Sequence, residues 1–142
     1  MFCLPRSSIL DPQSSIRNEF MDFADTLETI ANRIEGCAAV MILGIDGIPI
    51  ERHVQDLDQS LDVDIIATEF TTLVRRSMRT AADTELGELR EMVLATDAMT
   101  FLLRPITSDY FLLLALNPGG NVGRARFELR KAQLAMEIEF AM

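Results

Sequence analysis

The chain has 142 residues and a formal net charge of -9, with 49% hydrophobic and 25% charged residues. This length is enough for one domain with a real core and leaves little room for a second. The acidic balance argues against nucleic acid and against insertion into an anionic membrane surface, because both require a surplus of Lys and Arg.

The beginning of the chain differs in character from the rest. Residues 1–16 contain two prolines and several serines with no apolar periodicity, so we expect a flexible N-terminal arm followed by a domain over residues 17–142. The first ten residues are too short and too interrupted for the apolar core of a signal peptide. The two cysteines, Cys3 and Cys37, form no motif, which favours a reducing compartment. The expected location is therefore cytoplasmic.

A helix and a hairpin are predicted next. Apolar residues recur at three- and four-residue steps from Arg17, and Gly36 provides a stop. Residues 38–45 are apolar on both alternating faces, which predicts a strand covered on both sides. Asp46-Gly47 predicts a hairpin turn, and Pro49 assigns the strand that follows to an edge of the sheet.

A second helix is predicted over residues 62–82, with three kinds of surface. The predicted buried stripe is Ile66, Phe70, Leu73, Ser77 and Ala81. The opposite, solvent-facing side is predicted to carry Thr68, Thr71, Thr72, Arg75 and Arg79. Ala67, Val74 and Met78 form an apolar flank, which suits a second helix packed alongside. The residue types alone are consistent with two interpretations of the solvent-facing side, a docking surface and a merely solvated basic face.

Three strands and a last helix complete the chain. We expect strands over residues 89–96, 100–104 and 110–116 with short hairpin connections, then a helix over residues 121–140. The fold class is therefore α/β (α+β), a mainly antiparallel five-stranded sheet in the order α-β-β-α-β-β-β-α with helices on both faces. The last helix has two apolar sides, and the side with Phe127, Leu134 and Ile138 is expected to pack on the first helix, although a second partner site is conceivable.

The sequence contains no recognisable catalytic centre. The glycines at 119, 120 and 123 lack the spacing of a phosphate-binding loop, and the chain ends before the further strand that a dinucleotide site needs. The aspartates at 56, 58, 62 and 64 lack the Gly and Glu of a calcium loop. One histidine, His53, and two cysteines cannot build a zinc site. We expect no cofactor, no metal and no enzymatic activity.

The order of elements, the Gly44-Ile45-Asp46-Gly47 turn and the segment 121–132 (NVGRARFELRKA) together resemble the Roadblock / dynein light chain family, particularly its bacterial MglB-like branch. The resemblance covers residues 17–142. It implies that the first and last helices lie on one face of the sheet and the middle helix on the other. It also implies a homodimer in which the sheet continues through the third strands and the middle helices lie side by side.

The resemblance further implies a partner. In the bacterial branch the paired middle helices bind a small Ras-like GTPase and can speed its GTP hydrolysis without an arginine finger. The partner-binding residues would then be Thr68, Thr71, Thr72, Arg75 and Arg79. The dimer interface would comprise Ala67, Val74, Met78, Leu89, Glu91, Val93 and Ala95. The alternatives are a non-catalytic structural adaptor dimer that tethers a complex and, with no cluster of convergent polar groups to support it, a small-ligand sensor.

Overall fold

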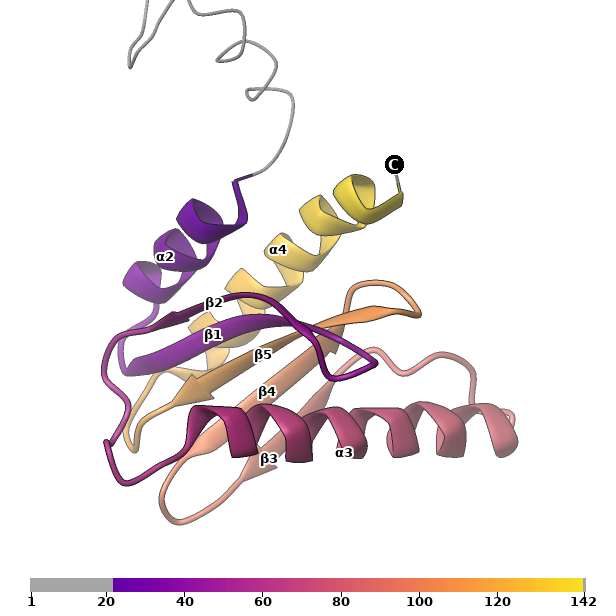
Figure 1. The fold of residues 1–142 in the computed structure, drawn as a ribbon, viewed down its shortest axis with the longest axis horizontal. Helices are drawn as coiled ribbons and strands as arrows, with labels where there is room; N and C mark the ends of the chain where they lie inside the picture. Colours follow the sequence, from indigo (N-terminus) through magenta and orange to yellow (C-terminus); the bar gives the residue numbers. More distant parts are fainter. Residues whose placement is uncertain (1–21, 142) are drawn as a thin grey trace, which may run out of the picture.

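The computed structural model describes residues 22–141; the predicted N-terminal arm and Cys3 lie outside the described residues. The elements follow the predicted order (Figure 1). They are α2 (Phe23–Arg33), β1 (Cys37–Gly44), β2 (Pro49–Val54), α3 (Val63–Asp83), β3 (Met92–Ala95), β4 (Thr100–Pro105), β5 (Tyr110–Leu116) and α4 (Val122–Ala141).

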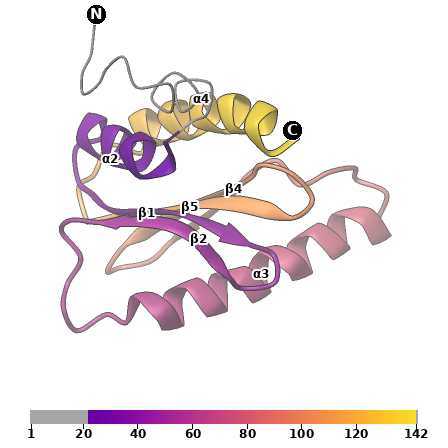
Figure 2. The same cartoon turned by 45° about the horizontal axis from the view of Figure 1, so that its top comes forward.

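One antiparallel sheet with the strand order β2-β1-β5-β4-β3 separates two layers of helix. Figure 2 shows α2 and α4 on one face and α3 on the other. Because side chains alternate along a strand, β1 serves two cores: Val40 and Ile42 face α2 and α4, whereas Met41 and Leu43 face α3. The prediction that the first strand is covered on both sides is confirmed, since every residue of β1 is buried.

Glycines close two tight turns. The β1–β2 turn has Gly47 at φ +91°, and the Asp46 carboxylate accepts a hydrogen bond from the Ile48 amide at 3.0 Å. Gly36, at φ +86°, joins α2 to β1 where the chain also meets Gly120. A Cβ on Gly36 would lie 2.5 Å from the Gly120 Cα, so the two backbones approach too closely for any other residue.

The third strand is shorter than predicted. The sequence predicts a strand from Leu89, but β3 begins at Met92. The preceding residues form a turn after α3, in which Glu85 and Gly87 have φ values of 58° and +94°. Ladder pairing with β4 begins at Met92, opposite Leu103, so residues 89–91 have no ladder partner and connect α3 to the sheet.

The middle helix is rotated relative to the prediction. Its buried residues are Phe70, Thr71 and Val74, whereas Leu73 and Ser77 of the predicted stripe are partly exposed. Thr71 was expected to face solvent, but its side chain is 2% exposed. Its hydroxyl donates to the Ala67 carbonyl at 2.7 Å, which satisfies the polar group inside the helix and allows its burial. Apolar residues cover so much of this helix that the sheet, rather than the pattern, sets which side is buried.

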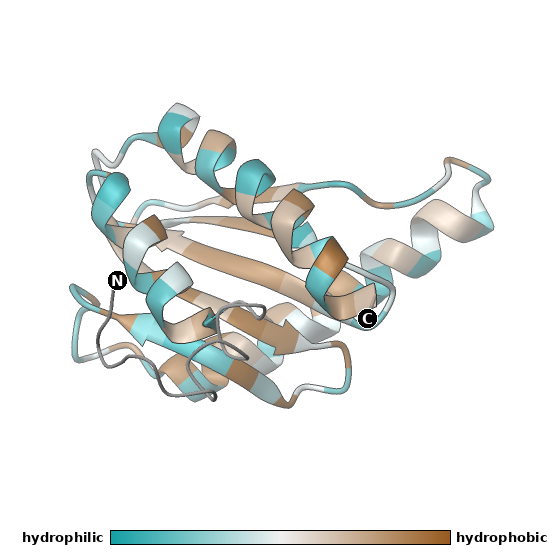
Figure 3. Cartoon of the chain, turned by 90° about the horizontal axis from the view of Figure 1, so that it is seen from above, coloured by the Kyte–Doolittle hydropathy of each residue, from teal (hydrophilic) through white to brown (hydrophobic). Residues whose placement is uncertain are grey.

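The last helix also departs from expectation. Ala125, Leu129 and Met136 are buried against the sheet as one apolar side. The other side does not pack on α2, because Phe127, Leu134 and Ile138 are 57%, 54% and 66% exposed. Figure 3 looks down on this layer, with hydrophobic and hydrophilic segments alternating along the helices above hydrophobic central strands. No helix in residues 22–141 combines the length and hydropathy needed to cross a membrane.

Candidate protein-interaction surface

The outer side of α3 presents polar and cationic groups. Thr68, Arg75 and Arg79 are exposed and Thr72 is half-buried. The two threonine hydroxyls donate to carbonyls one turn earlier, at 2.9 Å for Thr68 and 3.3 Å for Thr72. These hydroxyls are therefore partly satisfied within the helix, and the arginines are the groups most available to a partner.

The two arginines differ in how they are held. Arg75 donates from Nη1 to the Ile45 carbonyl at 3.2 Å, which holds its side chain over the β1–β2 turn. Arg79 lies one turn further along and has no ion pair with any residue from 22 to 141. On a protein with a net charge of -9, this pair forms a local cationic surface suited to carboxylates.

Two of the residues predicted for this surface do not lie on it. Thr71, predicted to bind a partner, and Val74, predicted for the dimer interface, are 2% and 0% exposed within a single chain. Both pack against the sheet because α3 is rotated about its axis relative to the predicted stripe. Ala67 and Met78 remain partly exposed beside the core on this face.

The predicted residues of the third strand are also distributed unevenly. Val93 and Ala95 are exposed on the open edge of the sheet, because β3 has a neighbouring strand, β4, on one side alone. Leu89 is half-buried and packs beneath α3. Glu91 forms ion pairs within the chain, with Arg104 at 3.4 Å and with Arg126 at 2.6 Å. The hydrogen bond to Glu91 also raises the pKa of Arg126 above its ordinary value.

Three exposed apolar side chains, in α3, just beyond its end and in β3, were not predicted from the sequence. Ile65 at the start of α3 is 61% exposed, Leu86 just beyond its end is 78% exposed, and Leu94 in β3 is 39% exposed. Ile65 and Leu86 lie outside the predicted stripe and flank, and Leu94 occupies the alternate position to the predicted strand residues. Their exposure depends on the sheet edge and on the rotation of α3, which the sequence pattern does not determine.

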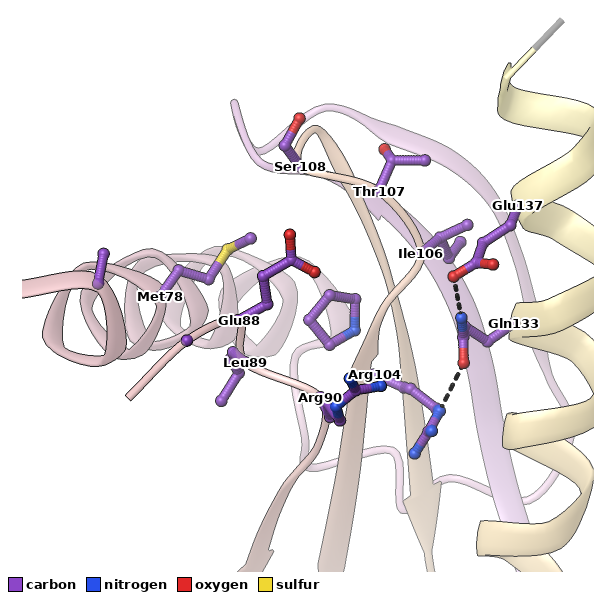
Figure 4. A pocket seen from close by; sticks show the side chains of 13 residues that line it. Met78, Glu88, Leu89, Arg90, Arg104, Ile106, Thr107, Ser108, Gln133 and Glu137 are labelled. Atoms are coloured by element: carbon purple, nitrogen blue, oxygen red, sulfur yellow. Dashed lines mark hydrogen bonds between the residues drawn. The ribbon is translucent and has the colours of Figure 1, made fainter. Parts of the chain in front are cut away.

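A cavity of about 450 Å³ lies between the end of α3, the segment leading to β3, the end of β4 and α4 (Figure 4). On its wall Arg104 donates from Nε to Gln133 Oε1 at 2.9 Å, and the Gln133 amide donates to Glu137. These polar groups bond to one another, so they do not converge on a ligand. Residues 22–141 contain no group of three His, Cys, Asp or Glu side chains that could hold a metal ion.

Two buried ionisable groups have structural explanations. Glu128 is 1% exposed and is surrounded by Arg124, Lys131 and Arg33 at 3.0, 3.5 and 3.6 Å, so it ties α4 to α2. Neither carboxylate oxygen of Glu128 accepts a hydrogen bond from residues 22–141, so the three cations hold it through charge. Burial raises the pKa of the Cys37 thiol to about 11, which disfavours the reactive thiolate. Neither group has the surroundings of a catalytic residue.

Comparison with models of protein families and with curated protein sequences gives no match. Comparison with solved structures gives several. MglC from Myxococcus xanthus is 31% identical, with a TM-score of 0.59, and the match covers 84% of this chain and 99% of MglC. MglB from Myxococcus xanthus is 15% identical, with a TM-score of 0.75 and coverage of 87% and 98%. A Roadblock/LC7 domain from Streptomyces avermitilis is 14% identical, with a TM-score of 0.72 and coverage of 87% and 99%. The chain belongs to the Roadblock family, among its MglB-like members.

Proposed function

We propose that this chain is a homodimeric regulator that binds a small Ras-like GTPase across its paired α3 helices. The observation that carries the proposal is that one chain combines a cationic outer side of α3 with an open, apolar edge strand, β3. The edge strand offers a place for a second copy, and the outer side of α3 offers a place for a charged partner.

The dimer would form through β3. The strand Met92–Ala95 contains no charged residue and no proline, and Val93 and Leu94 are 47% and 39% exposed. An apolar edge strand with free backbone groups readily pairs with another strand. Pairing two copies of β3 about a two-fold axis continues the sheet and places the two α3 helices antiparallel on the same face.

The ends of α3 support the same arrangement. In an antiparallel pair, the start of one helix lies beside the end of the other. Ile65 near the start and Leu86 just after the end are both strongly exposed, so each would come close to the other residue of the second copy. Burial of these side chains would remove apolar surface from water and stabilise the pair.

The partner would bind on the outer side of the two α3 helices. Thr68, Thr72, Arg75 and Arg79 form this side once Thr71 is excluded. The family resemblance implies a small Ras-like GTPase as the partner, and the similar MglB of Thermus thermophilus is a gliding protein, which makes motility or cell polarity the process we infer.

We infer that the chain has no catalytic centre of its own. Arg75 is bonded to a backbone carbonyl of its own chain, and the threonine hydroxyls are bonded within the helix. Any acceleration of GTP hydrolysis would therefore come largely from groups of the GTPase that this surface orders.

The test is a double charge reversal, Arg75→Glu with Arg79→Glu. We expect loss of binding to the GTP-analogue form of the partner GTPase, measured by calorimetry, with the mass of the dimer unchanged. Glu28→Arg, on α2 on the opposite face of the sheet, is a control for charge reversal away from α3 and should retain binding. Unchanged affinity in the double variant would contradict the assignment of this surface.

The structural-adaptor alternative is separated from the regulator by one measurement. GTP turnover by the GTPase is compared with and without this protein at saturating concentration. A regulator changes the rate, whereas an adaptor binds and leaves it unchanged.

A further inference from the structure

The outer side of α4 carries an apolar ridge formed by Phe127, Leu134 and Ile138. These side chains are more than half exposed, although the opposite side of the same helix is buried in the core. The ridge lies on the layer of α2 and α4, on the other face of the sheet from α3 (Figure 2). It is therefore separate from the surface proposed for the GTPase.

The spacing along the ridge is that of a helix–helix seam. Arg124, Phe127, Lys131, Leu134 and Ile138 follow one another at alternating steps of three and four residues. This alternation is the a/d pattern by which two helices pack along each other. Three of the five positions are large and apolar, and the other two are long cationic side chains.

The cationic positions are held in place. Arg124 and Lys131 each lie 5.5 Å from the centroid of the Phe127 ring. Both are also ion-paired to the buried Glu128, at 3.0 and 3.5 Å. Their charged ends therefore border the aromatic ring and are restrained by the same carboxylate, which lowers the entropy lost when another surface packs on it.

The charges beside the seam indicate what binds there. Arg130 and Glu137 lie seven residues apart on the same flank, and both are exposed. One oxygen of Glu137, Oε1, accepts a hydrogen bond from the Gln133 amide within the same helix. Arg130 has no ion pair within residues 22–141. If two copies of α4 pack antiparallel, this flank of one helix faces the same flank of the other, so Arg130 meets Glu137 in both directions. The helix is thus complementary to itself when reversed.

We propose that the ridge is a homotypic interface in which α4 packs antiparallel on α4 of a second copy. Phe127 of one copy then faces Ile138 of the other, and Leu134 packs near the middle of the seam. An anionic membrane is a poorer occupant, because Asp25 and Glu28 are exposed on α2 in the same layer. The interface uses none of the β3 residues, so it adds to the proposed dimer and gives assemblies of four or more chains.

The experiment uses charge reversal and rescue in the full chain, followed by sedimentation velocity over a range of concentrations. Arg130→Glu and Glu137→Arg should each weaken one association step by about tenfold, because both symmetric pairs become repulsive. The combined variant, with both changes, restores opposite charges and should associate like the unaltered chain. Leu134→Glu should abolish the association step that uses the ridge, because it places a charge in the middle of the seam. Glu28→Arg, on α2, is the matched control and should leave the mass unchanged.

The outcomes separate this interface from the β3 dimer. If both interfaces form, Leu134→Glu reduces the larger assembly to two chains. If the β3 dimer fails and the α4 interface holds, the unaltered protein has two chains and Leu134→Glu gives single chains of 15.9 kDa. The proposal would be overturned if Leu134→Glu left the mass unchanged. It would also be overturned if the combined variant associated as weakly as the two single variants, and the ridge would then bind another occupant.

Discussion

At the scale of single residues, Gly36 has two separate requirements. Its φ of +86° lies in the left-handed region, and the Cα of Gly120 occupies the space where a Cβ would be. Gly47 has a similar φ of +91°, but no atom other than those of Gly47 and its two chain neighbours lies within 4 Å of its Cβ position. Comparison of substitutions at Gly36 and Gly47 therefore distinguishes the effect of backbone strain from that of a steric clash.

We expect Gly36→Ala to lower the free energy of unfolding by about 3 kcal/mol, because strain and clash act together. Gly47→Ala should cost about 1 kcal/mol from strain alone. Urea denaturation followed by circular dichroism measures both. Equal losses would show that the contact between the two backbones relaxes freely.

Residue chemistry also explains the errors in the predicted interaction surface. Thr71 was expected in solvent because it lies opposite the predicted buried stripe, yet its hydroxyl bonds to the Ala67 carbonyl and the side chain is buried. Val74 was expected to be free for a second helix and instead lies in the core of its own chain. Polarity of the residue type is a weak guide where the helix backbone can satisfy the side chain.

At the scale of elements, the start of α3 is well defined by the sequence. Asp62 is its N-cap, and the carboxylate accepts hydrogen bonds from the amides of Asp64 and Ile65 at 2.9 and 3.2 Å. Acidic residues at this end also interact favourably with the helix dipole. The sequence predicted the helix from Asp62, and the structure starts it one residue later, at Val63.

Replacing this cap tests how far α3 depends on it. Asp62→Ala should destabilise the protein by about 1 kcal/mol, because two amides lose their acceptor. Asp62→Asn keeps an acceptor oxygen, so its free energy of unfolding should fall by only a few tenths of that amount. Thermal unfolding under identical conditions compares the two variants, and equal losses would attribute the effect to charge rather than to capping.

At the scale of the whole molecule, the two edges of the sheet are protected differently. Edge strand β2 begins with Pro49 and contains Glu51 and Arg52, and its pairing with β1 has a register shift. Charges, proline and irregular register all discourage pairing with another chain. Edge strand β3 has none of these residues, so we expect association at β3 and not at β2.

Matched substitutions on the two edges test this expectation. Val93→Asp in β3 should remove one association step, since it places a charge in the proposed sheet junction. Ile50→Asp in β2, where the side chain is 41% exposed compared with 47% for Val93, should leave the mass unchanged. Light scattering after size-exclusion chromatography provides the masses. If Ile50→Asp dissociates the assembly and Val93→Asp does not, the sheet junction lies at the β2 edge instead.

The sequence by itself determined the order of the elements, the buried first strand, the hairpin turn and the start of α3 to within one residue. These follow from interactions between residues close in the chain: alternation, helical periodicity, Asp-Gly and proline. The tertiary structure decided which side of α3 faces the sheet, where β3 begins and which side of α4 remains exposed. Each of these depends on surfaces brought together from distant parts of the chain, and a helix with apolar residues on two sides is compatible with either orientation until the sheet and its neighbouring helix are in place.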